Sequence, residues 1–172
     1  MRRCPVRYVD GPNPLPLYLY RDMLLPTISR ILAPTDFSDH SCYALSYART
    51  FADRWNSELH LLNVIEPAVF PTEAGLTPMG MMNLDSELAD AAHKAMHELL
   101  NRPELSGIVP VTSIAHGRAS TAIIEYAVDK QIDLIVIATH GRKGLEHFIF
   151  GSTAERVVRE SPCPVLTVRP PR

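Results

Sequence analysis

The stretch "ATHGRKGLEHFIFGST", residues 138–153, has the residue types that could hold a phosphate. It follows the apolar run "DLIVI" and precedes "AERVVRE", whose composition indicates a helix. Gly151, Ser152 and Thr153 would then begin that helix, where unpaired N–H groups and the helix dipole favour an anion. Gly141 would let the main chain approach a ligand closely. These positions predict a phosphate site.

The same stretch carries cations and hydroxyl groups that suit a nucleotide. Arg142 and Lys143 would offset phosphate charge, and the Ser152 hydroxyl would help to place Mg²⁺. A simpler interpretation is that Gly151 and Ser152 only cap a helix and that the two cations are solvated. The residues by themselves leave both interpretations open.

Other side chains are weaker candidates for chemistry. Asp36 follows an apolar run, so it could bond a ribose, bind a metal or act as a base; bonding its own turn is a close alternative. His93 and His97 have the spacing of a metal pair on a helix, but no third ligand is evident, which favours a solvated face. His116 could donate at the rim of the site and His140 could touch a phosphate, but both are interpreted as polar loop residues.

Motifs of the common nucleotide and hydrolase enzymes are absent from the sequence. It contains no G-x-S-x-G, no G-x-x-x-x-G-K-S/T, no H-E-x-x-H and no G-x-G-x-x-G. We therefore expect no catalytic residues, and slow ATP hydrolysis is only a distant alternative.

The elements that must position these residues alternate regularly along the chain. The apolar runs predict strands at 30–36, 58–67, 108–117, 133–139 and 163–170. Helical spacing predicts helices that begin at Ser38 or Asp39, at Leu84, at Ala119 and at Gly151. The first has its apolar positions at Ala44, Leu45, Ala48, Phe51, Ala52 and Trp55, and the second at Leu84, Leu88, Ala91, Ala92, Ala95 and Leu99.

This alternation is typical of an α/β fold, a parallel sheet with helices on both faces. Ligands in such sheets lie beyond the carboxyl ends of the strands. The loops expected there include "PTDFSDHS", "AHGRAS" and residues 138–153. Residues 67–83, with three prolines and three methionines, are expected to form a long loop.

Composition narrows the class of protein. The chain has 172 residues, 46% hydrophobic and 21% charged, which suits one globular domain. Its net charge of -2 offers no basic surface for nucleic acid, and no apolar run is long enough to span a membrane. Three cysteines without a C-x-x-C pair predict neither a disulfide framework nor a zinc site, which favours a cytoplasmic location.

The two ends of the chain suggest contacts with other subunits. Residues 1–29, with "GPNPLPLYLYRDMLLP", are predicted to be an arm outside a domain at 30–170; alternatively the protein starts at Met23, so that residues 1–22 are not part of it. The strand at 164–169 is predicted to lie at a sheet edge and to pair across a two-fold axis, giving a homodimer.

With these segments together, the chain resembles the universal stress protein family from about residue 29 to residue 170. The resemblance rests on "ILAPTDFSDHSCYAL", "HLLNVIEP", "AHGRAS" and "IDLIVIATHGRKGLEHFIFGSTAERVVRESPCPVLTVR". It implies a Rossmann-like three-layer sandwich with a five-stranded parallel sheet in the order 3-2-1-4-5, and usually a homodimer.

One branch of that family binds ATP and has the pattern Gly-x2-Gly-x9-Gly-Ser/Thr. Here Ala138 replaces the first glycine, while Gly141, Gly151 and Ser152 match the rest. The resemblance implies nucleotide contacts from Pro34, Thr35, Asp36, Val64, Ile137, Ala138, Thr139, Gly141, Arg142, Gly151, Ser152 and Thr153, and a Mg²⁺ bound with ATP near Ser152.

The sequence and the resemblance together predict a cytoplasmic stress-response protein that binds ATP or a related adenine nucleotide. Bound nucleotide would order the loops at 67–83 and 141–150 and change the surface offered to a protein partner. The alternative is a nucleotide-free dimeric interaction module of the same fold, which the Ala138 replacement motivates.

Overall fold

The computed structural model describes residues 27–67, 78–139 and 151–171. The elements in chain order are β1 (Arg30–Pro34), α2 (Asp39–Trp55), β2 (Glu58–Ile65), α3 (Pro78–Leu100), the short 3₁₀ helix η2 (Pro103–Leu105), β3 (Val111–His116), α4 (Ala119–Asp129), β4 (Leu134–Ala138), α5 (Ser152–Glu160) and β5 (Val165–Val168). The strands form one five-stranded sheet in the order β3-β2-β1-β4-β5, and every pairing is parallel. The predicted α/β fold and strand order are confirmed.

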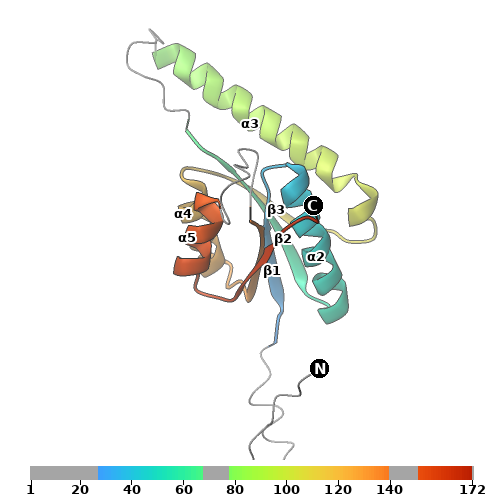
Figure 1. The fold of residues 1–172 in the computed structure, drawn as a ribbon. Coiled ribbons are helices and arrows are strands. Elements are labelled where there is room, and N and C mark those ends of the chain that lie inside the picture. The colour runs from blue at the N-terminus through green and yellow to red at the C-terminus, as the bar shows by residue number, and fades with distance from the viewer. Residues whose placement is uncertain (1–26, 68–77, 140–150, 172) are drawn as a thin grey trace, which may run out of the picture.

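The sheet is the middle of three layers (Figure 1). Helices α2 and α3 cover one face, and α4 and α5 cover the other. Successive residues of a strand point to opposite faces, so Ile31 packs under α2 while Leu32 packs under α4 and α5. Both side chains are fully buried, as the continuous apolar run of a central parallel strand requires.

Helix α2 begins where the sequence predicts. Ser38 is its N-cap, and the Ser38 hydroxyl oxygen accepts from the Ser41 N–H at 3.3 Å. The helix ends at Asn56 in the left-handed conformation, with φ of 54°. Trp55 was expected on the core face, but it is 47% exposed and stacks on the ring of Phe51.

Helix α3 corrects the expectation of a loop over residues 67–83, because the helix already begins at Pro78. Proline suits the first turn of a helix, where its missing N–H has no partner to lose, and the methionines that follow are good helix formers. The rest of that expected loop, residues 68–77, lies outside the described residues. The core face of α3 also differs in part: Met96 is buried, whereas Ala91 is exposed.

The third strand is shorter than predicted and starts at Val111. Pro110 cannot donate to a sheet ladder, so the pairing with β2 begins just after it. Within the described ranges, no helix is both long and apolar enough to cross a membrane.

The winding direction of the chain reverses between β1 and β4. From β1 the chain builds outward through β2 to β3, and it then returns to β4 on the other side of β1. In parallel sheets, ligands bind where such neighbouring strands part at their carboxyl ends. The ends of β1 and β4 therefore frame the candidate site.

Candidate functional site

The end of β1 is held rigidly by hydrogen bonds. The Thr35 N–H donates to the Leu62 carbonyl oxygen of β2 at 2.8 Å. The Thr35 hydroxyl oxygen accepts from the Phe37 N–H at 3.0 Å and lies 3.1 Å from the Ser41 hydroxyl. Thr35 is only 6% exposed, so its side chain shapes the floor of the site.

Asp36 occupies the turn that leads from β1 into α2. Its Oδ1 accepts from the Ser38 N–H at 3.1 Å and from the Ser38 hydroxyl at 2.6 Å. The turn interpretation of Asp36 is therefore correct for this oxygen. Phe37, the next residue, has φ of 63°, which is rare for a bulky side chain. Such local strain concentrates at functional sites, where surrounding contacts impose it.

Asn63 is a site residue that the sequence analysis missed. It lies within the apolar strand β2, is 7% exposed, and donates from Nδ2 to the Thr35 carbonyl oxygen at 2.8 Å. The available signal was a lone amide inside "HLLNVI", because a buried amide needs a specific partner.

Val64 directs its main-chain groups toward the space beyond β1. Alternate residues of a parallel strand point their N–H and C=O toward the same neighbour. The Leu62 carbonyl accepts from Thr35, whereas the Ile65 carbonyl accepts from the Gly117 N–H on the side of β3. Val64 therefore faces the side of β1, whose pairing with β2 stops at Pro34 and Leu62. A contact between the Val64 backbone and an adenine stays a prediction.

The end of β4 is tied directly to the start of α5. The Thr139 N–H donates to the Val168 carbonyl oxygen at 3.0 Å, and the Gly151 N–H donates to the Thr139 carbonyl oxygen at 2.7 Å. The second bond brings residue 151 to the carboxyl edge of the sheet, beside the end of β1. Ile137 precedes them and is buried against α4 and α5.

Ala138 occupies a regular strand position rather than a special backbone conformation. It pairs with Val168, is 7% exposed, and does not have a positive φ. Its methyl group belongs to the buried cluster beneath α2. Glycine's freedom to adopt positive φ is therefore not required at this position.

The first turn of α5 forms the other wall of the site. Gly151 is the N-cap with φ of -73°, Thr153 is half-buried, and Ser152 is exposed. As at any helix start, the first N–H groups of this turn have no partner within the helix. Gly141 and Arg142, together with Lys143 and His140, lie outside the described residues.

The remaining sequence candidates do not assemble into a second site. His93 and His97 are exposed, and the His97 ring lies 3.2 Å from the Asn101 side-chain amide. Among the described residues, no three His, Cys, Asp or Glu side chains gather as metal ligands. His116 ends β3 and is also exposed.

Two cysteines are described and both are free thiols. Cys163 packs against the core cluster beneath α4 and α5, as expected for a structural position. Burial raises the pKa of its thiol, which disfavours the nucleophilic thiolate.

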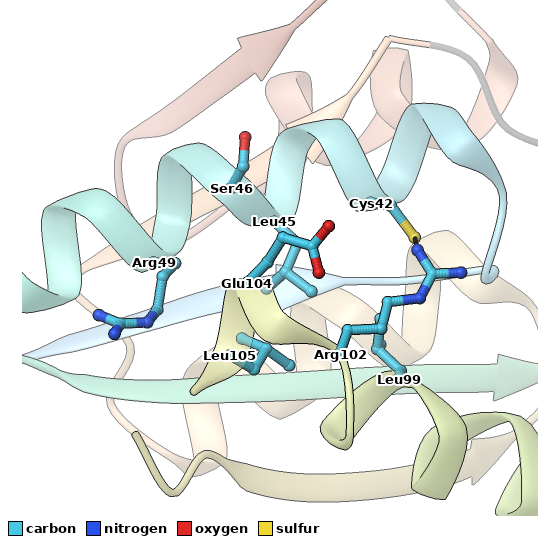
Figure 2. A pocket seen from close by; sticks show the side chains of 8 residues that line it. All are labelled: Cys42, Leu45, Ser46, Arg49, Leu99, Arg102, Glu104 and Leu105. Atoms are coloured by element: carbon cyan, nitrogen blue, oxygen red, sulfur yellow. Dashed lines mark hydrogen bonds between the residues drawn. The ribbon is translucent and has the colours of Figure 1, made fainter. Parts of the chain in front are cut away.

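A small cavity lies away from the strand ends, between α2 and the turn that follows α3 (Figure 2). Its volume is about 40 Å³, and its polar lining includes Cys42, Arg49, Arg102 and Glu104. This volume suits a water molecule or two and excludes a nucleotide. This cavity is therefore not a candidate nucleotide site.

Comparison with known proteins matches the chain to a single protein family. The sequence model of the universal stress protein family matches residues 27–169. Universal stress protein MJ0531 from Methanocaldococcus jannaschii is 35% identical over 144 residues, which cover 83% of each chain.

Solved structures share the fold. The universal stress protein UspA from Lactobacillus plantarum superposes with a TM-score of 0.71 at 29% identity, over 84% of this chain and all of the other. A universal stress protein solved in complex with cAMP superposes with a TM-score of 0.62 at 21% identity, over 83% of this chain and 98% of the other.

Proposed function

Because the chain belongs to the universal stress protein family, we propose that it binds an adenine nucleotide at the carboxyl edge of β1 and β4. We further propose that the nucleotide is ATP with Mg²⁺ and that the bound state regulates a partner. The observation that carries the proposal is the 2.7 Å hydrogen bond from Gly151 to Thr139, which sets a helix start against the switch point of the sheet. These two features are each suited to a nucleotide, and here they coincide.

The phosphates fit the α5 side of this edge. The N–H groups of Ser152 and Thr153, in the first turn of α5, supply hydrogen-bond donors and a positive dipole end. The hydroxyls of Ser152 and Thr153 suit phosphate oxygens, and an oxygen ligand such as Ser152 suits a Mg²⁺ that keeps most of its water. Gly141 and Arg142 remain part of the proposal on sequence grounds.

The adenosine fits the β1 and β2 side. In this proposal the N–H and C=O of Val64 bond the edge of the adenine, and Asp36 bonds a ribose hydroxyl. Pro34 and Thr35 form the buried floor between them. The fold neighbour that was solved with cAMP is consistent with adenine recognition by this architecture.

The replacement of the first motif glycine by Ala138 is compatible with a nucleotide at this edge. Its methyl group packs into the core under α2, and its backbone is ordinary strand. The alanine therefore adds volume on the core side, so the alternative of a nucleotide-free module loses its main motivation.

The direct test is to purify the full chain gently, extract it with acid and identify any released nucleotide by chromatography. Calorimetry with ATP and Mg²⁺, and separately with AMP and cAMP, then gives affinity and preference. Gly151→Val should weaken ATP binding at least about tenfold, since it places a branched side chain where the phosphates approach and disturbs charge-assisted hydrogen bonds. Thr50→Ala, an exposed change on α2, is the control.

An empty protein without binding heat at several temperatures, confirmed by equilibrium dialysis, would refute nucleotide binding. Equal affinities of Gly151→Val and the parent chain would place the nucleotide elsewhere. The regulatory part has its own test: limited proteolysis within 68–77 and 140–150 should slow at saturating ATP. Phosphate release should stay at the background rate, because no catalytic residues are proposed.

A further inference from the structure

Helix α2 carries four aromatic side chains spaced four residues apart, which we call the aromatic ridge: Tyr43, Tyr47, Phe51 and Trp55. Side chains at this spacing are neighbours on one side of a helix. The rings of Phe51 and Trp55 stack with their centres 4.9 Å apart and 8° between their planes. Those of Tyr43 and Tyr47 meet edge to face at 5.4 Å, and their hydroxyls lie 3.3 Å apart. The ridge is thus preorganised along the helix.

The side chains of the aromatic ridge are only partly buried in the core. Tyr43 and Phe51 pack their inner sides against the cluster under α2, but Tyr47 is 40% exposed and Trp55 is 47% exposed. The opposite flank of α2, with Cys42 and Ser46, faces the turn after α3 (Figure 2). The ridge therefore lies on the flank of α2 that the turn after α3 leaves uncovered.

The chain reaches this helix just before β1. The Ser57 hydroxyl donates to the Ile28 carbonyl oxygen at 2.5 Å, and the Glu58 N–H donates to the Ser29 carbonyl oxygen at 2.8 Å. Ile28 packs against the same cluster as Phe51. Residue 28 is therefore fixed next to the carboxyl end of α2, within a few residues of Trp55.

Residues 11–20, which precede Ile28 in the chain, have a composition that suits an aromatic surface. The stretch "GPNPLPLYLY", residues 11–20, holds three prolines, three leucines and two tyrosines. Proline-rich segments favour the polyproline II conformation, which docks on exposed aromatic side chains at a low entropic cost. From Tyr43 to Trp55 the ridge is about 18 Å long, and residues 15–26 in that conformation reach about 37 Å. The segment can therefore reach the whole ridge from residue 27.

We propose that residues 11–20 dock on the aromatic ridge of their own chain. Attachment at Ile28 keeps the segment at a high local concentration near the ridge, which favours this occupant over a second copy or an unrelated peptide. This inference is independent of nucleotide binding, because the ridge lies on the flank of α2 and not at the carboxyl edge of the sheet.

Trp55 is the only tryptophan among 172 residues, so its fluorescence reports on the ridge alone. The test compares the full chain with the full-length triple variant Leu15→Ser, Leu17→Ser and Leu19→Ser. Acrylamide quenching of Trp55 should rise roughly twofold in the variant, with a red-shifted emission, because docking would cover most of the ring surface that is now exposed. The matched control replaces Val6, Tyr8 and Val9 by serine and should quench like the parent chain.

The quenching is measured over a range of protein concentrations together with sedimentation. Equal quenching of the parent chain and the leucine variant would overturn the proposal. A difference that disappears on dilution and follows the dimer fraction would assign the ridge to a second copy and also overturn it. As a second readout, Tyr47→Ser should accelerate trypsin cleavage after Arg21, whereas Val128→Ser, an exposed apolar change on α4, should leave it unchanged.

Discussion

Asn63 of β2 donates from its side-chain amide to the Thr35 carbonyl oxygen at 2.8 Å, and both residues are buried. Thr35 also donates its own N–H to Leu62, so both main-chain groups of Thr35 are held by β2. These two hydrogen bonds continue the contact between β1 and β2 by one residue, to Thr35, past the last ladder pair at Pro34. Asp36, which follows directly, owes its position at the sheet edge to this arrangement.

We expect Asn63→Ala to lower the free energy of unfolding by about 1–3 kcal/mol, because it leaves the buried Thr35 carbonyl without this donor. Urea unfolding followed by circular dichroism measures the change. Lys94→Ala, at an exposed position on α3, is the control and should change stability by less than about 0.5 kcal/mol. A loss at residue 63 no larger than the control would show that the buried bond contributes little.

The Ser38 cap gives a second prediction. Ser38→Ala should destabilise the fold by about 1 kcal/mol, since the N–H of Ser41 and the Oδ1 of Asp36 both lose a partner. Ser38→Asn, which restores an acceptor, should recover part of that loss. Thermal unfolding of the three chains decides the matter, and equal midpoints would contradict the capping role.

Strand β5 pairs with β4 and is an edge strand in the described sheet, which supports the predicted homodimer through residues 164–169. The carbonyls of Pro164 and Val168 accept from β4, so the N–H of Thr167 points outward along the free edge. Thr167→Pro should therefore weaken dimerisation while leaving the sheet intact.

Sedimentation across micromolar concentrations measures this effect. Thr167→Val, which keeps the N–H, should remain a dimer. A parent chain that is monomeric throughout this range, or a proline variant that associates as strongly as the parent, would refute pairing through β5.

The reactivity of the Cys42 thiol should depend on alkaline pH. Burial raises the pKa of Cys42 above its ordinary value of 9.0, and the nearby Arg102 guanidinium partly opposes this rise. Alkylation of Cys42 by iodoacetamide should therefore be slow at neutral pH and increase above pH 9.0. Arg102→Ala removes the opposing charge, so it should move the alkylation profile to still higher pH.

The raised pKa of Cys42 also makes the stability of the fold depend on pH. A thiol whose pKa is higher in the folded than in the unfolded protein stabilises the fold at any pH below its unfolded-state pKa. This stabilisation is lost as the pH rises through its folded-state pKa. The parent chain should lose this contribution above pH 9.0, while Cys42→Ser should lack that part of the dependence. Identical pH profiles of the two chains in urea unfolding would contradict it.

Local patterns in the sequence were sufficient for the order of the elements. Continuous apolar runs predicted β1 and β4, because a central strand is buried on both faces. The serine before α2 predicted the helix start, because a cap bonds residues close to it in the chain. The exception was α3, because Pro78 was counted within the loop expected at 67–83 although proline equally begins a helix.

The sequence by itself determined the alternation of strands and helices, and hence the parallel sheet and the family resemblance. Only the tertiary structure decided that Asn63 holds Thr35, that Ala138 points into the core and that Trp55 remains exposed. Those outcomes depend on which strands become neighbours and on how each helix packs against the sheet. Contacts between residues distant in the chain set both, and no local periodicity encodes them.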